Sequence, residues 1–178
     1  NADTDELTPP AEWNEELQKF VIGGRLIDPK TARLPQFHQV SVWAILQRAL
    51  AFFEDGPALG RRIPWAFEGN RLIVVPRAGY GKNAFYDRDS KSLQFYYFGS
   101  DPDVIYTCLS TDIVNHEFGH AVLDGIRPLY NESSLVQTGA FHEFIGDLTA
   151  ILLTLQNGEL RRYLADQTAG DIAEATAI

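Results

Sequence analysis

The pentapeptide His116-Glu117-Phe118-Gly119-His120 holds the residues whose types and spacing point most directly to chemistry. On an α-helix, residues i and i+4 lie above one another on one face, so both imidazoles can reach one zinc ion at about 2.0–2.1 Å. Glu117 lies beside them and can accept a proton from a water on that metal. The spacing predicts two metal ligands and a general base. The alternative is a core helix with two hydrogen-bonded histidines.

A third ligand is expected from a second pair of residues spaced four apart, Glu143 and Asp147. A hydrolytic zinc site takes three protein ligands and leaves one position for water. Carboxylates in so apolar a segment require a positive partner, so we expect Glu143 to bind the metal. Asp147 could accept the free N–H of a ligating histidine as an outer partner. The alternative for Glu143 is an ordinary surface glutamate.

These two motifs resemble those of the thermolysin-like (gluzincin) zinc metallopeptidases. That family carries His-Glu-x-x-His-Ala-Val and, further along, Gly-Ala-x-x-Glu-x-x-x-Asp. Residues 116–122 here read His-Glu-Phe-Gly-His-Ala-Val, and residues 139–147 read Gly-Ala-Phe-His-Glu-Phe-Ile-Gly-Asp. The resemblance extends over roughly residues 36–156. It implies a zincin-like fold, zinc on His116, His120 and Glu143, and peptide-bond hydrolysis with Glu117 as base.

The resemblance also implies two sites for substrate. Residues 81–86 are similar to the family's edge strand, so Asn83 and Ala84 would hold the peptide backbone as an added strand. Tyr130 would donate a hydrogen bond to the oxyanion of the reaction. The alternatives are a plain turn-to-strand junction at Asn83 and a buried aromatic ring at Tyr130.

The chain departs from the family pattern at two places. The family has a transition-state histidine well after the third ligand, but no histidine follows His142 here, and His142 points about 100° around the helix from Glu143. Residues 150–154 read Ala-Ile-Leu-Leu-Thr, so a paired calcium site is unsupported, although Asp112 leaves calcium possible. Residues 171–178 begin a helical pattern without a cap, and we therefore expect the domain to continue.

Composition places further limits on the function. The 178 residues are 45% apolar, which is enough for one domain with its own hydrophobic core. We assign this domain to residues 36–178 and residues 1–35 to an acidic and partly loose extension. The net charge of −9 argues against nucleic acid or anionic membranes as partners. A peptide or protein substrate is what the resemblance implies. The single cysteine, Cys108, excludes an internal disulfide and lies in an apolar run where a buried thiol is expected. Secretion is an expectation from the resemblance alone, and the oligomeric state stays open.

The predicted architecture is α+β, with an antiparallel sheet ahead of the central motif helix and a further ligand-bearing helix. We expect helices at 11–21, 37–54, 112–124 and 139–156, and strands at 71–75, 84–87 and 93–98. Asp124 and Gly125 are expected to stop the motif helix. His38 is expected to form a structural hydrogen bond.

Three functions are compatible with these observations. The first is a zinc endopeptidase. The second is a relative that retains zinc for structure or for peptide binding without turnover. The third is an interaction domain that binds no metal.

Overall fold

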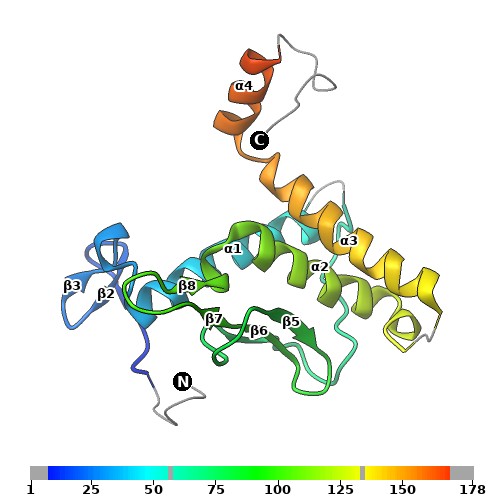
Figure 1. The fold of residues 1–178 in the computed structure, drawn as a ribbon, viewed down its shortest axis with the longest axis horizontal. Coiled ribbons are helices and arrows are strands. Elements are labelled where there is room, and N and C mark those ends of the chain that lie inside the picture. Colours follow the sequence, from blue (N-terminus) through cyan, green and yellow to red (C-terminus); the bar gives the residue numbers. More distant parts are fainter. Residues whose placement is uncertain (1–7, 56–57, 133–134, 169–178) are drawn as a thin grey trace.

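The structure is a computed structural model that describes residues 8–55, 58–132 and 135–168. Residues 1–7, the start of the acidic extension, and the helical pattern expected at 171–178 lie outside the described residues. The described part is α+β, as predicted, with small sheets and four α-helices (Figure 1).

The chain begins with an antiparallel sheet where the sequence predicts a helix, so that prediction is wrong. Strands β1 (Glu12–Asn14), β2 (Lys19–Ile22) and β3 (Arg25–Leu26) pair in that order. Asn14 Oδ1 accepts from the Leu17 backbone N at 2.8 Å, and Gln18 takes a positive φ of 50°, which together close a turn. Trp13 then faces Phe20 across the hairpin with ring centroids 5.0 Å apart. Cross-strand aromatic packing therefore outweighs the helical periodicity.

The central sheet consists of β4 (Ile73–Val75), β6 (Ser92–Phe95) and β5 (Ala84–Asp87), in that spatial order. The hairpin β5–β6 is antiparallel, as predicted, but β4 runs parallel to β6, so the sheet is mixed. The chain passes across the end of β6 between β4 and β5, where Ala78 N donates to Phe95 O at 2.8 Å. This crossing leaves β5 at the edge of the sheet. A two-stranded sheet of β7 (Tyr97–Phe98) and β8 (Ile105–Tyr106) follows.

Four helices complete the described fold: α1 (Pro35–Glu54), α2 (Thr111–Ile126), α3 (Val136–Thr154) and α4 (Gly158–Gln167). Figure 1 shows α2 between the β5–β6 hairpin and α3, with α4 projecting away from the rest. The core gathers on α1, β6 and α2 and includes Val42, Ala49, Leu93, Phe95, Val114, Phe118 and Ala121. No helix among the described residues is long and apolar enough to cross a membrane.

Two expectations about single residues have clear outcomes. Cys108 is fully buried in this core, as predicted, and burial raises the pKa of its thiol to about 12. Gly125 does not end α2, which continues to Ile126. The glycine is instead required by packing, because a Cβ there would stand 1.7 Å from the Pro64 carbonyl oxygen. The turn after Asp124 therefore passes too close to another segment for any side chain.

Candidate metal centre

The motif residues lie on α2, a helix whose start is capped and whose body is buried. Ser110 Oγ accepts from the Ile113 backbone N, which satisfies one unpaired amide of the first turn. Val114, Phe118 and Ala121 are buried and hold one side of the helix against the core. The opposite side turns His116 and His120 toward α3. Burial of the apolar face thus determines where the two imidazoles point.

Helices α2 and α3 approach closely because each lacks a side chain where they cross. A Cβ at Gly119 would come within 2.8 Å of Thr149 Oγ1 and 3.0 Å of the Gly146 Cα. A Cβ at Gly146 would come within 2.8 Å of the His116 ring. Neither glycine was singled out from the sequence. A glycine inside an apolar helical pattern is the signal that could have found them.

Three side chains converge between the helices. The nearest ligand atoms of His116, His120 and Glu143 all lie within 4.8 Å of one another. His116 Nε2 is 3.4 Å from one Glu143 oxygen, and His120 Nε2 is 3.7 Å from the other. Among the described residues, no other group of His, Cys, Asp or Glu is arranged to hold a metal. The donor set of two imidazoles and one carboxylate suits zinc and related divalent metals.

The other nitrogen of each imidazole is engaged by a residue of α3. Asp147 Oδ1 lies 2.9 Å from His116 Nδ1, at hydrogen-bonding distance. His142 Nδ1 lies 2.8 Å from His120 Nδ1. Both Nε2 atoms are therefore directed toward Glu143, while Asp147 and His142 contact the two Nδ1 atoms. A ligating imidazole is oriented in this manner by a partner on its remote nitrogen.

His142 is the residue at this site whose role the sequence analysis missed. Its position about 100° around the helix directs it away from Glu143. That direction is the reason it can reach His120 from behind. Its own Nε2 is buried and has no hydrogen-bond partner among the described residues. Burial lowers the pKa of both His120, to about 4, and His142, so each ring is neutral at pH 7.

Neutral rings leave only one arrangement of protons that permits metal binding. If His120 offers its Nε2 lone pair to a metal, its Nδ1 carries the proton and donates to His142 Nδ1. His142 must then be protonated on Nε2. The opposite tautomer of the pair would place a proton on His120 Nε2 and block the metal.

Glu117 is buried beside the triad, with 7% of its surface exposed. Its Oε2 accepts a hydrogen bond from the Tyr86 backbone N of β5 at 3.0 Å. Burial raises the pKa of the carboxyl, while the charge of His116 and the hydrogen bond from Tyr86 oppose that rise. This hydrogen bond joins Glu117 of α2 to β5, the edge strand of the sheet.

The two α3 carboxylates are more exposed than the sequence suggests. The side chain of Glu143 is 68% exposed and that of Asp147 is 71% exposed. They lie amid apolar residues along the helix, but on a face that opens to solvent. The three converging ligands are therefore reachable from outside the protein.

The other predicted residues are not part of the triad and have contacts of their own. Asn83 directly precedes β5, and its Oδ1 accepts from the Ala84 backbone N at 3.0 Å. Tyr130 lies in the 3₁₀ turn Pro128–Tyr130, is 40% exposed, and packs its ring edge-on against Phe141 at 5.9 Å. Asp112 accepts from Thr154 Oγ1 at 3.0 Å, so its carboxylate already has a protein partner. His38 forms the expected structural contacts, with Nε2 2.8 Å from Ala32 O.

A second polar network supports the far end of α2. The carboxylate of Asp124 is fully buried and accepts from Arg88 through two nitrogens and from the Tyr86 hydroxyl at 2.8 Å. Arg88 also donates to Glu132 and to the Pro128 carbonyl. Burial, together with the hydrogen bond to Asp124, raises the pKa of the Tyr86 phenol. The network joins the β5–β6 hairpin, α2 and the loop that carries Tyr130.

Comparisons of the chain with protein-family models, with curated proteins and with solved structures gave no match. What can be stated of the site is therefore a His-His-Glu group that could hold a metal, on two helices packed beside the edge of a small sheet.

Proposed function

We propose that this protein binds zinc through His116, His120 and Glu143 and uses it to hydrolyse peptide bonds as an endopeptidase. The observation that carries the proposal is the convergence of the three ligand atoms within 4.8 Å, with the remote nitrogen of each imidazole already engaged. A site with three protein ligands leaves a position for water, which is typical of catalytic zinc. Bound zinc would supply a Lewis acid that polarises the water and the substrate carbonyl.

Glu117 supports the proposal as general base. Its carboxylate is buried next to the triad, and the pKa raised by burial brings it closer to that of a useful proton acceptor at neutral pH. The hydrogen bond from Tyr86 N occupies only one of its oxygens. The other oxygen can accept a proton from water and pass it to the leaving amine.

The edge of β5 supports a peptide as the substrate. Asn83 O accepts from Tyr96 N, and hydrogen bonds alternate along an antiparallel pair, so the backbone groups of Ala84 and Tyr86 face away from β6. The Tyr86 N is taken by Glu117, which confirms that direction. The Ala84 N–H already donates to Asn83 Oδ1, so a peptide strand added at this edge would donate to the Ala84 carbonyl and lie beside Glu117 and the metal ligands.

A second candidate function is zinc-dependent peptide binding without efficient turnover. The observation that favours it is the placement of the four histidines. His38 forms structural hydrogen bonds, His142 supports His120, and the other two are ligands. None of the four histidines is left to stabilise an oxyanion, so that role would require another donor, such as Tyr130.

Metal analysis tests the shared part of both candidates. Purified protein dialysed against trace zinc should retain about one zinc per chain, as three convergent ligands predict. Glu143→Ala should lower that affinity, whereas Glu159→Ala, on the exposed first turn of α4, should not. Zinc well below one per chain in the unaltered protein would remove both candidates.

Activity separates the two. Casein or a furylacryloyl dipeptide should be cleaved, and a chelator should abolish cleavage until zinc is restored. Glu117→Gln should retain zinc and lose hydrolysis by at least about a hundredfold, since general-base catalysis contributes that much. Zinc binding without hydrolysis by the unaltered chain would favour the second candidate. Hydrolysis that survives Glu117→Gln would contradict the assigned base.

A further inference from the structure

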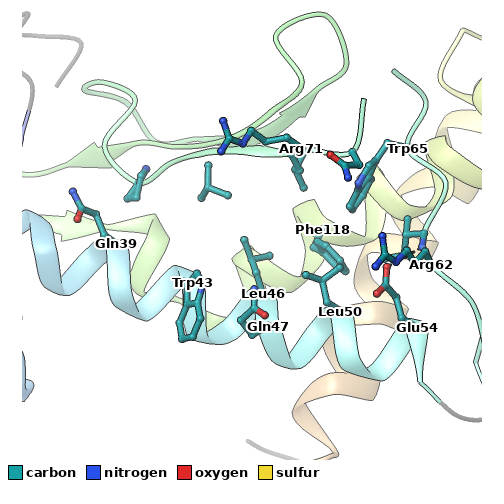
Figure 2. A pocket seen from close by; sticks show the side chains of 15 residues that line it. Gln39, Trp43, Leu46, Gln47, Leu50, Glu54, Arg62, Trp65, Arg71 and Phe118 are labelled. Atoms are coloured by element: carbon teal, nitrogen blue, oxygen red, sulfur yellow. Dashed lines mark hydrogen bonds between the residues drawn. The ribbon is translucent and has the colours of Figure 1, made fainter. Parts of the chain in front are cut away.

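A cavity of about 800 Å³ opens between α1 and β4, on the side of α2 away from the metal ligands (Figure 2). Helix α1 contributes Leu46 and Leu50 to one wall, and Trp65 and Val74 form the opposite wall. Figure 2 shows the ring of Phe118 between these two walls. A space of this volume falls in the range of small-molecule sites, which is about 300–1,000 Å³.

Much of the cavity wall is apolar, although Gln39, Gln47 and Asn70 also line it. Leu46 and Phe118 are buried and belong to the main core cluster, while Leu50, Trp65 and Val74 pack against that cluster. The core of the protein is therefore continuous with the cavity wall. An aromatic or aliphatic body placed there would remove apolar surface from water on both sides.

The rim of the cavity is cationic. Arg62 and Arg71 line it, and neither guanidinium forms an ion pair with a carboxylate of the described residues. Glu54 is the only acidic residue of the lining, and its Oε1 already accepts from the Ile63 backbone N at 3.0 Å. Figure 2 shows Arg71 on the sheet side and Arg62 beside Glu54 at the end of α1.

We propose that this cavity binds a small amphipathic anion, with an aromatic or aliphatic body in the apolar interior and one carboxylate or sulfonate at Arg62 or Arg71. The guanidinium groups present several N–H donors in a fixed geometry that matches such an acid group. The apolar walls supply affinity, and the arginines select the charge.

This site is distinct from the metal centre, although the two share a helix. Phe118 lies between His116 and His120 in sequence, but its ring packs into the core and toward the cavity. No metal ligand lines the cavity. Loss of zinc binding through Glu143→Gln should therefore leave binding at the cavity unchanged, so this proposal and the proposed function can fail separately.

A pair of fluorescent probes tests the charge preference directly. 8-Anilino-1-naphthalenesulfonate has the proposed chemistry, and N-phenyl-1-naphthylamine has the same rings without the sulfonate. Titrated into the folded protein, the sulfonate should bind with one site per chain and more tightly than the neutral compound. Decanoate should displace it, and decanol should do so less well.

Variants then locate the site. Arg62→Gln with Arg71→Gln should weaken the sulfonate about fivefold and leave the neutral probe unchanged, as for the loss of a partly solvated ionic contact of about 1 kcal/mol. The matched control is Arg48→Gln, an arginine of α1 that lines a different cavity. Leu50→Trp should fill the space and weaken both probes, with circular dichroism to verify the fold.

Three results would overturn the proposal. The first is equal binding of the two probes to the unaltered protein. The second is unchanged affinity of the arginine double variant for the sulfonate probe, which would mean that the probe binds adventitiously and not through these arginines. The third is a folded Leu50→Trp protein with unchanged affinity for both probes.

Discussion

Gly146 on α3 lies against the imidazole of His116 on α2, so closely that an added Cβ would stand 2.8 Å from the ring Cε1 and 2.9 Å from both ring nitrogens. The missing side chain gives the ring the space in which its Nδ1 reaches Asp147 and its Nε2 faces Glu143. The position of a metal ligand on one helix therefore depends on a glycine of the next.

Gly146→Ala should lower zinc affinity, because the methyl group must displace either the His116 ring or the helix. Overpacking of this kind costs about 1–3 kcal/mol, so a loss of stability in the metal-free protein is also expected. Competition with a chromophoric chelator measures the affinity, and urea unfolding measures the stability.

The matched control is Gly139→Ala on the same helix, where an added Cβ meets nothing within 4 Å. It should bind zinc normally and be stabilised by about 0.5–1 kcal/mol through helix propensity. Equal zinc affinities for the two alanine variants would contradict the steric role of Gly146.

His142→Leu should weaken zinc binding about 10- to 100-fold, the usual effect of removing a partner from a ligating imidazole. The Nδ1–H of His120 would lose its acceptor, and the ring would lose its fixed orientation. His142→Asn keeps an oxygen that can accept the same proton and should recover most of the affinity. Zinc titrations of both variants are the measurement. Equal losses in Leu and Asn variants would show that the imidazole acts by packing rather than as an acceptor.

Arg88→Ala should destabilise the protein by about 3–5 kcal/mol, because it leaves the fully buried Asp124 without its charged partner. Urea unfolding with and without the substitution measures the difference. The control is Arg33→Ala, which breaks an ion pair whose side chains are 73% and 87% exposed. That loss should not exceed about 1 kcal/mol. A cost at Arg88 no larger than the cost at Arg33 would show that the buried network does not hold α2.

His38 predicts a loss of stability in mild acid. Burial, and then the charge of Arg77, lowers the pKa of its ring to about 4 in the folded protein, from 6.5 in the unfolded chain. Between these values the unfolded chain binds more protons, so stability is full above about pH 6.5 and falls as the pH drops toward 4. The limit of this contribution is about 3 kcal/mol.

The measurement is urea unfolding at pH 7 and pH 4.5 for the unaltered protein and for His38→Gln. The glutamine cannot titrate, so the variant should lose less stability on acidification. Taking the difference between the two proteins removes the contributions of the other titrating groups. Identical pH dependences would mean that His38 does not titrate as its burial implies.

The helices that carry the site could be predicted because the signal is local. The spacing of His116 and His120, and of Glu143 and Asp147, identifies one face of each helix without any knowledge of packing. The hairpin β5–β6 could be predicted for a similar reason, since alternating residues flank a short turn region at 88–91.

The strand pairing at the N-terminus could not be predicted in this way. Residues 11–21 satisfy a helical pattern, but the contact of Trp13 with Phe20, and of Phe20 with Trp43 of α1, favours a hairpin. The parallel pairing of β4 with β6 likewise depends on how the chain crosses between the strands. The periodicity of the sequence does not indicate which strands become neighbours.

The sequence by itself determined the donor groups and their spacing, because helical geometry relates residues four apart whatever the rest of the fold does. Only the tertiary structure decided that the two helices cross at Gly119 and Gly146, that His142 supports His120, and that Glu117 bonds to the edge strand. These relationships join residues more than twenty positions apart in the chain. They depend on how closely two surfaces pack, which no local pattern of residue types encodes.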